Sequence, residues 1–159
     1  MAAVAERAGV GTGTAYVHYQ SKDELVLATY LEQKRELGTA GAIGVDPTQA
    51  PPERFRQLWH GVYRHLAADP DRARFLIQFA ASPHAPLGHE HSLRIPDDDL
   101  LRVAAAGDMA PLLVDVPPLV LYDLGIGLAV RLAAAPNHDM DPRTLDQVAG
   151  ACWRAISKA

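Results

Sequence analysis

A group of hydroxyl, aromatic and cationic side chains follows the first short apolar segment of the chain. Its members are Thr12, Thr14, Tyr16, His18, Tyr19 and Lys22. Because bulky aliphatic residues are scarce in this segment, a helix there has little surface to bury in a core. Hydroxyl and cationic groups near a helix N-terminus suit phosphates and base edges, and Gly13 allows a DNA duplex to approach the backbone closely. The residue types therefore predict DNA binding.

Two short helices joined by a tight turn would position these side chains. Val4, Ala5 and Ala8 have the spacing of a narrow apolar stripe on a first helix. Gly9 can take the left-handed conformation that ends a helix, and Gly11 is an acceptable N-cap for a second helix over residues 12–19. This arrangement is a helix-turn-helix, in which the second helix enters the major groove of DNA.

The segment from Val4 to Leu25, VAERAGVGTGTAYVHYQSKDEL, resembles the DNA-binding signature of the TetR-type transcriptional regulators. In that signature AGV closes the first helix of the motif, GTxYxHF forms the recognition helix, and SKxxL opens the next helix. The resemblance implies that five side chains contact DNA: Thr12, Thr14, Tyr16, His18 and Lys22. Of these, it implies that Tyr16, His18 and Lys22 bind phosphates. Taken singly, each is also compatible with an ordinary surface or half-buried residue. The shared register favours DNA contact.

The family carries a further helix ahead of this motif, which packs across both of its helices. In the present sequence Met1 falls at the start of the following helix. Without that packing, a helix of about eight residues is marginally stable in water. A second interpretation therefore stays open, in which the chain dimerises and binds a ligand but no longer binds DNA.

Composition predicts an all-α protein. Hydrophobic residues make up 48% of the chain and aromatic residues only 6%, which favours closely packed helices over a sheet. The formal charge of -4 argues against a protein that coats nucleic acid, but not against a reader whose positive charge is local. The single cysteine, Cys152, excludes an internal disulfide and is expected to be a buried thiol. No apolar stretch is long enough to span a bilayer, so we expect a soluble, cytoplasmic protein.

Glycine and proline residues divide the chain into three parts. Residues 1–37 are predicted to form the helix-turn-helix domain and a connecting helix that a capping box, Ser21 to Glu24, would start. Residues 38–52 are predicted to be a linker, and residues 53–159 a ligand-binding and dimerisation domain. Within this last part, apolar periodicity and capping signals predict helices from about Phe55 to Leu66, from Pro70 toward Pro83, and over 97–106, 119–135 and 142–156.

Large aromatic side chains on facing helices would line an apolar pocket for a small hydrophobic ligand, although each also suits a plain core. The candidates are Trp59, Tyr63, Phe75, Phe79 and Tyr122. The last two predicted helices would pair with their copies in a homodimer, as the family resemblance also implies. The candidate contacts there are Tyr122, Gly125, Ala129, Ala149 and Trp153.

Other residue groups give weaker signals. His84, His89, Glu90 and His91 have donor atoms suited to a metal, but a histidine cluster without cysteine in an irregular segment is more typical of a solvated connector. We therefore predict no metal and no cofactor. The sequence shows no nucleophile with a base and no glycine-rich phosphate loop, so we do not expect an enzyme. The expected function is a ligand-responsive transcriptional regulator, a repressor that leaves a palindromic operator when it binds its ligand.

Overall fold

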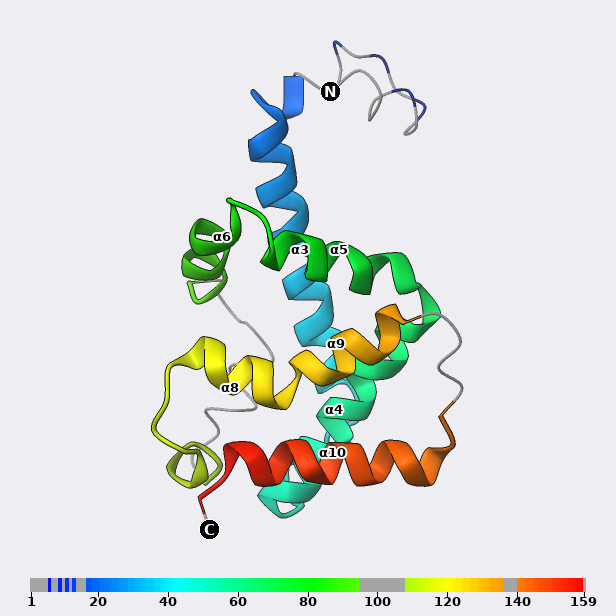
Figure 1. Cartoon of the computed structure of the whole chain (residues 1–159), viewed down its shortest axis with the longest axis vertical. Helices are drawn as coiled ribbons and strands as arrows, with labels where there is room; N and C mark the ends of the chain where they lie inside the picture. The colour runs from blue at the N-terminus through cyan, green and yellow to red at the C-terminus, as the bar shows by residue number, and fades with distance from the viewer. Residues whose placement is uncertain are drawn as a thin grey trace.

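The computed structural model describes Glu6, Gly9, Gly11, Gly13 and residues 17–94, 108–135 and 140–158. Across these residues the chain is built of helices and has no sheet, which confirms the predicted all-α class. A long helix, α3 (Lys22–Ala42), runs from the N-terminal segment into a bundle in which α4 (Pro51–Ala68) is central (Figure 1). The bundle is completed by α5 (Pro70–Ala80), α6 (Ala85–Ser92), α8 (Pro118–Gly125), α9 (Gly127–Ala134) and α10 (Pro142–Ile156).

The start of α3 has the predicted cap, with one difference in its bonding. The Ser21 hydroxyl accepts a hydrogen bond from the Glu24 N–H at 3.1 Å. The Glu24 carboxylate accepts in turn from the N–H of Gln20, at 2.7 Å, rather than from that of Ser21. The Glu24 N–H, which the helix itself leaves free, and the N–H of Gln20 just before the cap are both satisfied, which stabilises the point where the N-terminal segment joins the helical bundle.

The prediction that α3 ends at Leu37 is wrong, because the helix continues through Gly38 and Gly41 to Ala42. Both glycines are buried, and Gly41 lies where α4 crosses α3, since a Cβ atom added to it would lie 2.9 Å from Val62 Cγ2. On α4, a Cβ atom added to Gly61 would lie 2.8 Å from the carbonyl oxygen of Ala40 and 3.0 Å from that of Gly41. Gly41, which lies in the predicted linker, and Gly61 therefore let the two helices approach closely.

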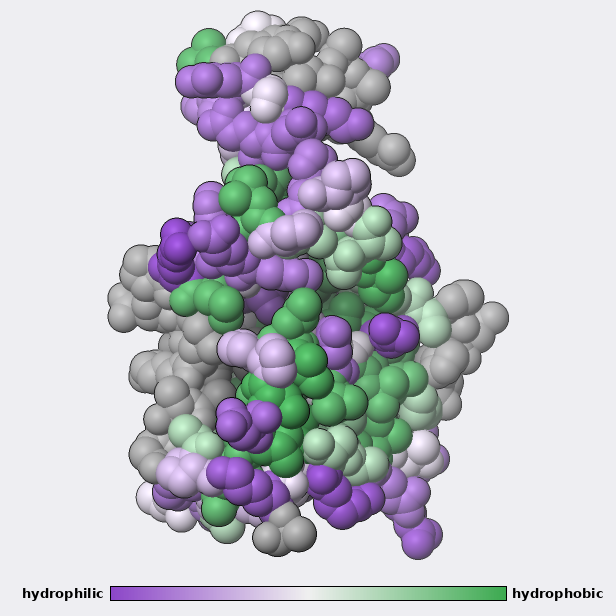
Figure 2. All heavy atoms as spheres, turned by 60° about the vertical axis from the view of Figure 1, so that its left-hand side comes forward, coloured by the Kyte–Doolittle hydropathy of each residue, from purple (hydrophilic) through white to green (hydrophobic). Residues whose placement is uncertain are grey.

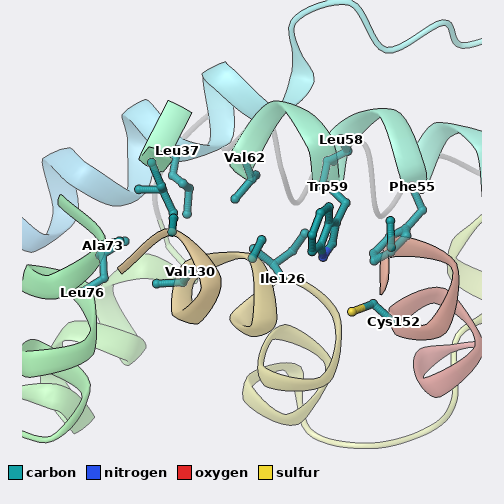
Figure 3. Close-up of a cluster of buried hydrophobic side chains, with 14 of the residues drawn as sticks. Leu37, Phe55, Leu58, Trp59, Val62, Ala73, Leu76, Ile126, Val130 and Cys152 are labelled. Atoms are coloured by element: carbon teal, nitrogen blue, oxygen red, sulfur yellow. The ribbon is translucent and has the colours of Figure 1, made fainter. Parts of the chain in front are cut away.

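Two helices begin as their proline and capping signals predict. Asp69 caps α5 and Asp141 caps α10, and each carboxylate accepts a backbone hydrogen bond from the first turn. The predicted apolar stripe of α4 is buried and forms the centre of the core: Phe55, Leu58, Trp59, Val62 and Leu66. Figure 3 shows several of these side chains beside residues of α5, α9 and α10.

Two predictions for the second half of the body are corrected. The segment 83–96 was predicted to lack a helix, but α6 forms within it because Gly88 packs directly against the rings of Phe79 and Tyr30, a tertiary contact that leaves no periodic pattern. The single helix predicted over 119–135 is divided into α8 and α9 at Ile126, although the backbone of Ile126 keeps helical dihedral angles. The helix predicted over 97–106 lies outside the described residues.

Backbone hydrogen bonds join the C-terminal residues 156–158 to residues 112–114. A short 3-10 helix, η1 (Ala110–Leu112), leads into a single β-bridge between Leu113 and Ser157. The N–H of Val114 donates to the Ile156 carbonyl at 2.9 Å, and the N–H of Lys158 donates to the Leu112 carbonyl at 2.7 Å. These bonds hold the end of α10 beside the segment that precedes α8.

Candidate functional site

The N-terminal segment shows the predicted turn at Gly9. Its φ of 68° is in the left-handed region, and its N–H donates to the Glu6 carbonyl at 3.1 Å. An L-residue with a side chain rarely adopts this conformation, which explains the glycine between the two predicted helices.

Three of the predicted DNA-binding residues are described, and all three are exposed. Gly13 and His18 have helical backbone, and Lys22 is the first residue of α3. Their side-chain or backbone surfaces are open to a partner. Thr12, Thr14 and Tyr16 lie outside the described residues.

Four of the five predicted pocket aromatics pack in pairs with other rings. Trp59 is fully buried and stacks on the half-buried Tyr63 at a centroid distance of 5.8 Å. Phe79 is stacked on Tyr30 of α3 at 3.8 Å and lies 6.2 Å from Phe75. The indole of Trp59 also points toward the thiol of Cys152, which is buried as predicted (Figure 3). These contacts are those of core residues.

An apolar cavity of about 150 Å³ lies between α4, α8 and α10. Tyr122 is the one predicted pocket residue on its wall. The wall is otherwise formed by aliphatic and aromatic carbon, and includes Phe55 and Leu58 of α4, Leu121 and Gly125 of α8, and Ile156 of α10. Sequence reasoning missed these residues because they come from distant segments and each also fits an ordinary helix stripe.

Tyr122 connects this cavity with a more polar region. Its ring also borders a cleft of about 160 Å³ that includes Tyr30, His89 and Asp123. The Nζ atom of Lys34, on α3, lies 3.8 Å from the centroid of the Tyr122 ring, in the geometry of a cation–π contact. Burial raises the pKa of the Tyr122 phenol, and the neighbouring Tyr30 and Asp123 raise it further. The phenol is therefore neutral at pH 7.

Burial lowers the pKa of His89, and the positive charge of Lys34 lowers it further, while Asp123 opposes the shift. His89 is therefore neutral at pH 7. Within the residues that the structure describes, no three histidine, cysteine, aspartate or glutamate side chains are grouped so that they could hold a metal ion. His84, His89 and His91 lie instead at the start of α6 and within it.

The structure places three of the five predicted dimer contacts inside the protomer. Ala129 and Ala149 are 0% exposed, and Gly125 is buried with Phe55 and Ile156 beside it. A second copy has no side-chain surface to contact at these positions, because the chain's own core already covers them. Trp153 is half-buried, with its ring 5.6 Å from that of Phe55, and Tyr122 is half-buried as well.

Other side chains of the same helices are apolar and exposed. The four large ones, 37–45% exposed, are Leu119, Val120, Leu124 and Leu128. On the adjoining α10, Ala151 and Ala155 are also exposed. We call these six residues the α8–α10 face. We call residues 1–21 the head, and the helical bundle that follows it the body. Figure 2 shows hydrophobic side chains gathered on the body, whereas hydrophilic ones predominate toward its junction with the head.

Comparison with known proteins agrees with this arrangement. Residues 52–157 match the family described as tetracyclin repressor-like, C-terminal domain, and residues 1–29 match the bacterial regulatory proteins of the tetR family. The chain belongs to the TetR family. It is a transcriptional regulator of that family, whose members bind operator DNA and dimerise.

Similar proteins match almost the whole of this TetR-family chain. An HTH-type transcriptional regulator of Haemophilus influenzae is 26% identical over an alignment of 163 residues. The alignment covers 99% of this chain and 84% of that protein. The crystal structure of a TetR-family transcriptional regulator from H. influenzae Rd has a TM-score of 0.75 at 25% identity and covers 97% of this chain and 82% of its own. A structure from Shewanella sp. PV-4 has a TM-score of 0.80 at 20% identity, with 99% and 87% covered, and supports the fold alone.

None of the described helices combines sufficient length with sufficient apolar character to cross a bilayer.

Proposed function

We propose that the chain is a ligand-responsive repressor that acts in the cytoplasm and binds a palindromic operator as a homodimer. The observation that carries the proposal is the helix-turn-helix signature, placed directly before the helix that enters the body. Lys22 is exposed at the first residue of this helix, after the Ser21 cap. A protein surface used for DNA needs this combination of exposed recognition residues and a fixed support.

The proposed DNA contacts are Thr12, Gly13, Thr14, Tyr16, His18 and Lys22. Cationic and hydroxyl groups would fix the position of the protein on the phosphates, while the residues at the start of the recognition helix would reach the base edges. The negative net charge of the chain makes this local cluster of donors the principal attraction for DNA.

The proposed dimer forms through the α8–α10 face. A two-fold axis places the same apolar surface of each protomer against its copy, so the exposed leucines of one copy would cover those of the other. Such a dimer presents two recognition helices, which enter successive major grooves when they are about 34–36 Å apart.

The proposed ligand response is a shift between two dimer conformations. A hydrophobic ligand that binds more tightly to a conformation with another separation of the recognition helices lowers the population that fits the operator. Changing a bound population from 99% to 1% takes about 5.5 kcal/mol of differential affinity.

Fluorescence anisotropy tests operator binding directly. The full 159-residue chain is titrated into the duplex that lies upstream of its own gene and into a scrambled duplex, at two salt concentrations. We expect selective binding that weakens steeply with salt, because phosphate contacts release counterions. Equal, weak binding to both duplexes would contradict the proposal and favour a dimer that binds a ligand without binding DNA.

Two variants and a control locate the contact. Tyr16→Ala should abolish selective binding with the dimer intact. Lys22→Ala should weaken binding to both duplexes and reduce the salt slope by about one for each protomer. Arg143→Ala removes an exposed cation from the start of α10 and should leave both quantities unchanged. An equal effect of Lys22→Ala and Arg143→Ala would show that the response reflects net charge alone.

A further inference from the structure

The cavity between α4, α8 and α10 has a size and a lining that select one kind of guest. Its volume is about 150 Å³, and among the described residues on its wall Tyr122 contributes the one hydroxyl group. An apolar cavity of this size is able to hold a single aromatic ring. The wall residues that the structure describes offer no charged group to a guest, so an ion would lose its hydration there without compensation.

The lining comes from helices on both sides of the body. Phe55 and Leu58 belong to α4, Leu121 and Tyr122 to α8, and Ile156 to α10. None of these lining residues comes from α3, although the structure describes all residues of that helix. A guest would contact the helix that carries the head only through an intermediate side chain.

Tyr122 is that intermediate. Its ring borders the cavity, and Lys34 of α3 is placed over the same ring at 3.8 Å from the centroid. A guest that moves or fixes the ring changes the surface on which the Lys34 ammonium group rests. Because α3 is one continuous helix from Lys22 to Ala42, such a change acts on the element that supports the predicted phosphate contact.

We propose that this cavity binds an uncharged, apolar molecule about the size of one aromatic ring, and that Tyr122 transmits its presence through Lys34 to α3. The first half concerns binding alone. The second half, regulation, rests on the proposed function. The two halves are therefore tested by separate measurements on the full chain.

Calorimetric titration with toluene tests the first half, and benzoate is the control because it adds a carboxylate to the same ring. We expect saturable binding of toluene, at least about tenfold tighter than that of benzoate. Equal affinities, or no saturable binding of toluene, would overturn the assignment of ligand class.

Two variants with opposite effects locate the guest. A Cβ on Gly125 would lie 3.4 Å from Ile156 Cδ1 and 3.6 Å from Phe55, which is ordinary contact, so Gly125→Val should fold and fill part of the cavity. We expect it to weaken toluene binding at least about tenfold. Leu121→Ala enlarges the cavity and should shift the preference from toluene toward n-butylbenzene. If Gly125→Val does not fold, Leu121→Ala alone tests the location of the guest. An unchanged preference for toluene over n-butylbenzene in that variant would show that the guest does not bind in this cavity.

Operator anisotropy with and without toluene tests the regulatory half. We expect toluene to weaken selective binding in the wild type, and to have at most a third of that effect in Lys34→Met, although calorimetry shows toluene still bound. An unchanged response in Lys34→Met, or bound toluene without any effect on operator binding, would overturn the route through Tyr122. If the chain binds no operator, the proposed function fails, whereas the calorimetric result for the cavity remains valid.

Discussion

The ammonium nitrogen of Lys34 lies 3.8 Å from the centre of the Tyr122 ring, and it also lowers the pKa of His89. One side chain of α3 thereby influences groups on both α8 and α6. These three helices border the cleft that contains Tyr30 and Asp123. The contact region is therefore an electrostatic junction between the helix that leads to the head and the body.

The first prediction concerns this junction. Lys34→Met keeps most of the aliphatic length and removes the charge, so the pKa of His89 should rise toward its ordinary value. An NMR titration of the histidine ring signals measures the change. Arg35→Met is the matched control, since Arg35 is more exposed and pairs with Glu32 on the surface. A similar shift in both variants would show a general effect of net charge.

The second prediction follows from the lowered pKa values of His65 and His89. Burial is the main cause at both residues, and the positive charges of Arg72 and Lys34 add to it. Glu36 and Asp69 oppose the shift at His65, and Asp123 opposes it at His89. The unfolded chain therefore binds protons more readily at these rings than the folded chain does.

The free energy of unfolding should consequently be highest above the ordinary histidine pKa of about 6.5. It should fall as the pH decreases through the lower pKa values that these histidines have in the folded state. Urea denaturation at pH 7.5 and pH 5.5 measures the loss. The double variant His65→Gln/His89→Gln should show a smaller difference between the two pH values. A difference as large as that of the wild type would assign the acid sensitivity to other groups.

The third prediction concerns the crossing of α3 and α4. Gly61→Ala places a Cβ 2.8 Å from the Ala40 carbonyl oxygen, so the helices must separate. We expect a loss of about 1–3 kcal/mol in the free energy of unfolding, measured by urea denaturation. Gly150→Ala, on α10, is the control because its Cβ would meet only Arg154 Nη1, at 3.5 Å, and it should gain about 0.5–1 kcal/mol. Equal effects of the two substitutions would show that helix propensity, rather than the α3–α4 crossing, determines the change in the free energy of unfolding.

Local signals in the sequence were sufficient for some elements and insufficient for others. Asp69 with Pro70, and Asp141 with Pro142, identify helix starts because a cap and an N1 proline act within one turn. Gly41 does not show its role locally, because a glycine that ends a helix and one that admits a crossing helix look alike in sequence. The partner that distinguishes the two roles for Gly41 is Gly61, which is about twenty positions away.

The same limitation applies to the cavity. Aromatic size alone suggested Trp59 and Phe79 as pocket residues, whereas both bury their rings against neighbouring rings. Whether a large side chain fills the core or borders a cavity depends on how its neighbours pack, and those neighbours come from separate helices. Tyr122 fits the pocket prediction because its ring packs against the core and also borders the cavity.

The fourth prediction concerns the attachment of α10 to α4. One Asp146 carboxylate oxygen lies 2.7 Å from Arg56 Nη1 and 2.7 Å from His60 Nε2, and Arg56, followed by His60, lowers the pKa of Asp146. Asp146→Asn should lower the free energy of unfolding by about 1 kcal/mol at pH 7, a small value because the side chains are partly exposed. Urea denaturation measures it, with Asp115→Asn as an exposed carboxylate control.

The contribution of Asp146 should be present above the ordinary aspartate pKa and disappear as the pH falls through the lower folded value. The difference between wild type and Asp146→Asn is therefore expected to vanish in strong acid. A difference that stays constant down to pH 3 would show that the variant acts by a route other than the charge of Asp146.

The fifth prediction concerns the α8–α10 face. Leu124 is 45% exposed and Leu128 is 37% exposed, at positions four residues apart. In a two-fold interface each substitution occurs twice and faces the same surface of the other copy. Leu124→Glu should therefore introduce two desolvated carboxylates and weaken the dimer by at least about tenfold.

Sedimentation velocity over a range of concentrations measures the dimer, and the wild type should have twice the mass of the chain. Leu87→Glu is the matched control, because Leu87 is 48% exposed but belongs to α6, which contributes no residue to this face. It should leave the mass unchanged. A dimer that persists in Leu124→Glu and dissociates in Leu87→Glu would move the interface to α6. If Leu124→Glu alone dissociates, its operator binding should fall in parallel, since a monomer presents one recognition helix and loses the second half-site.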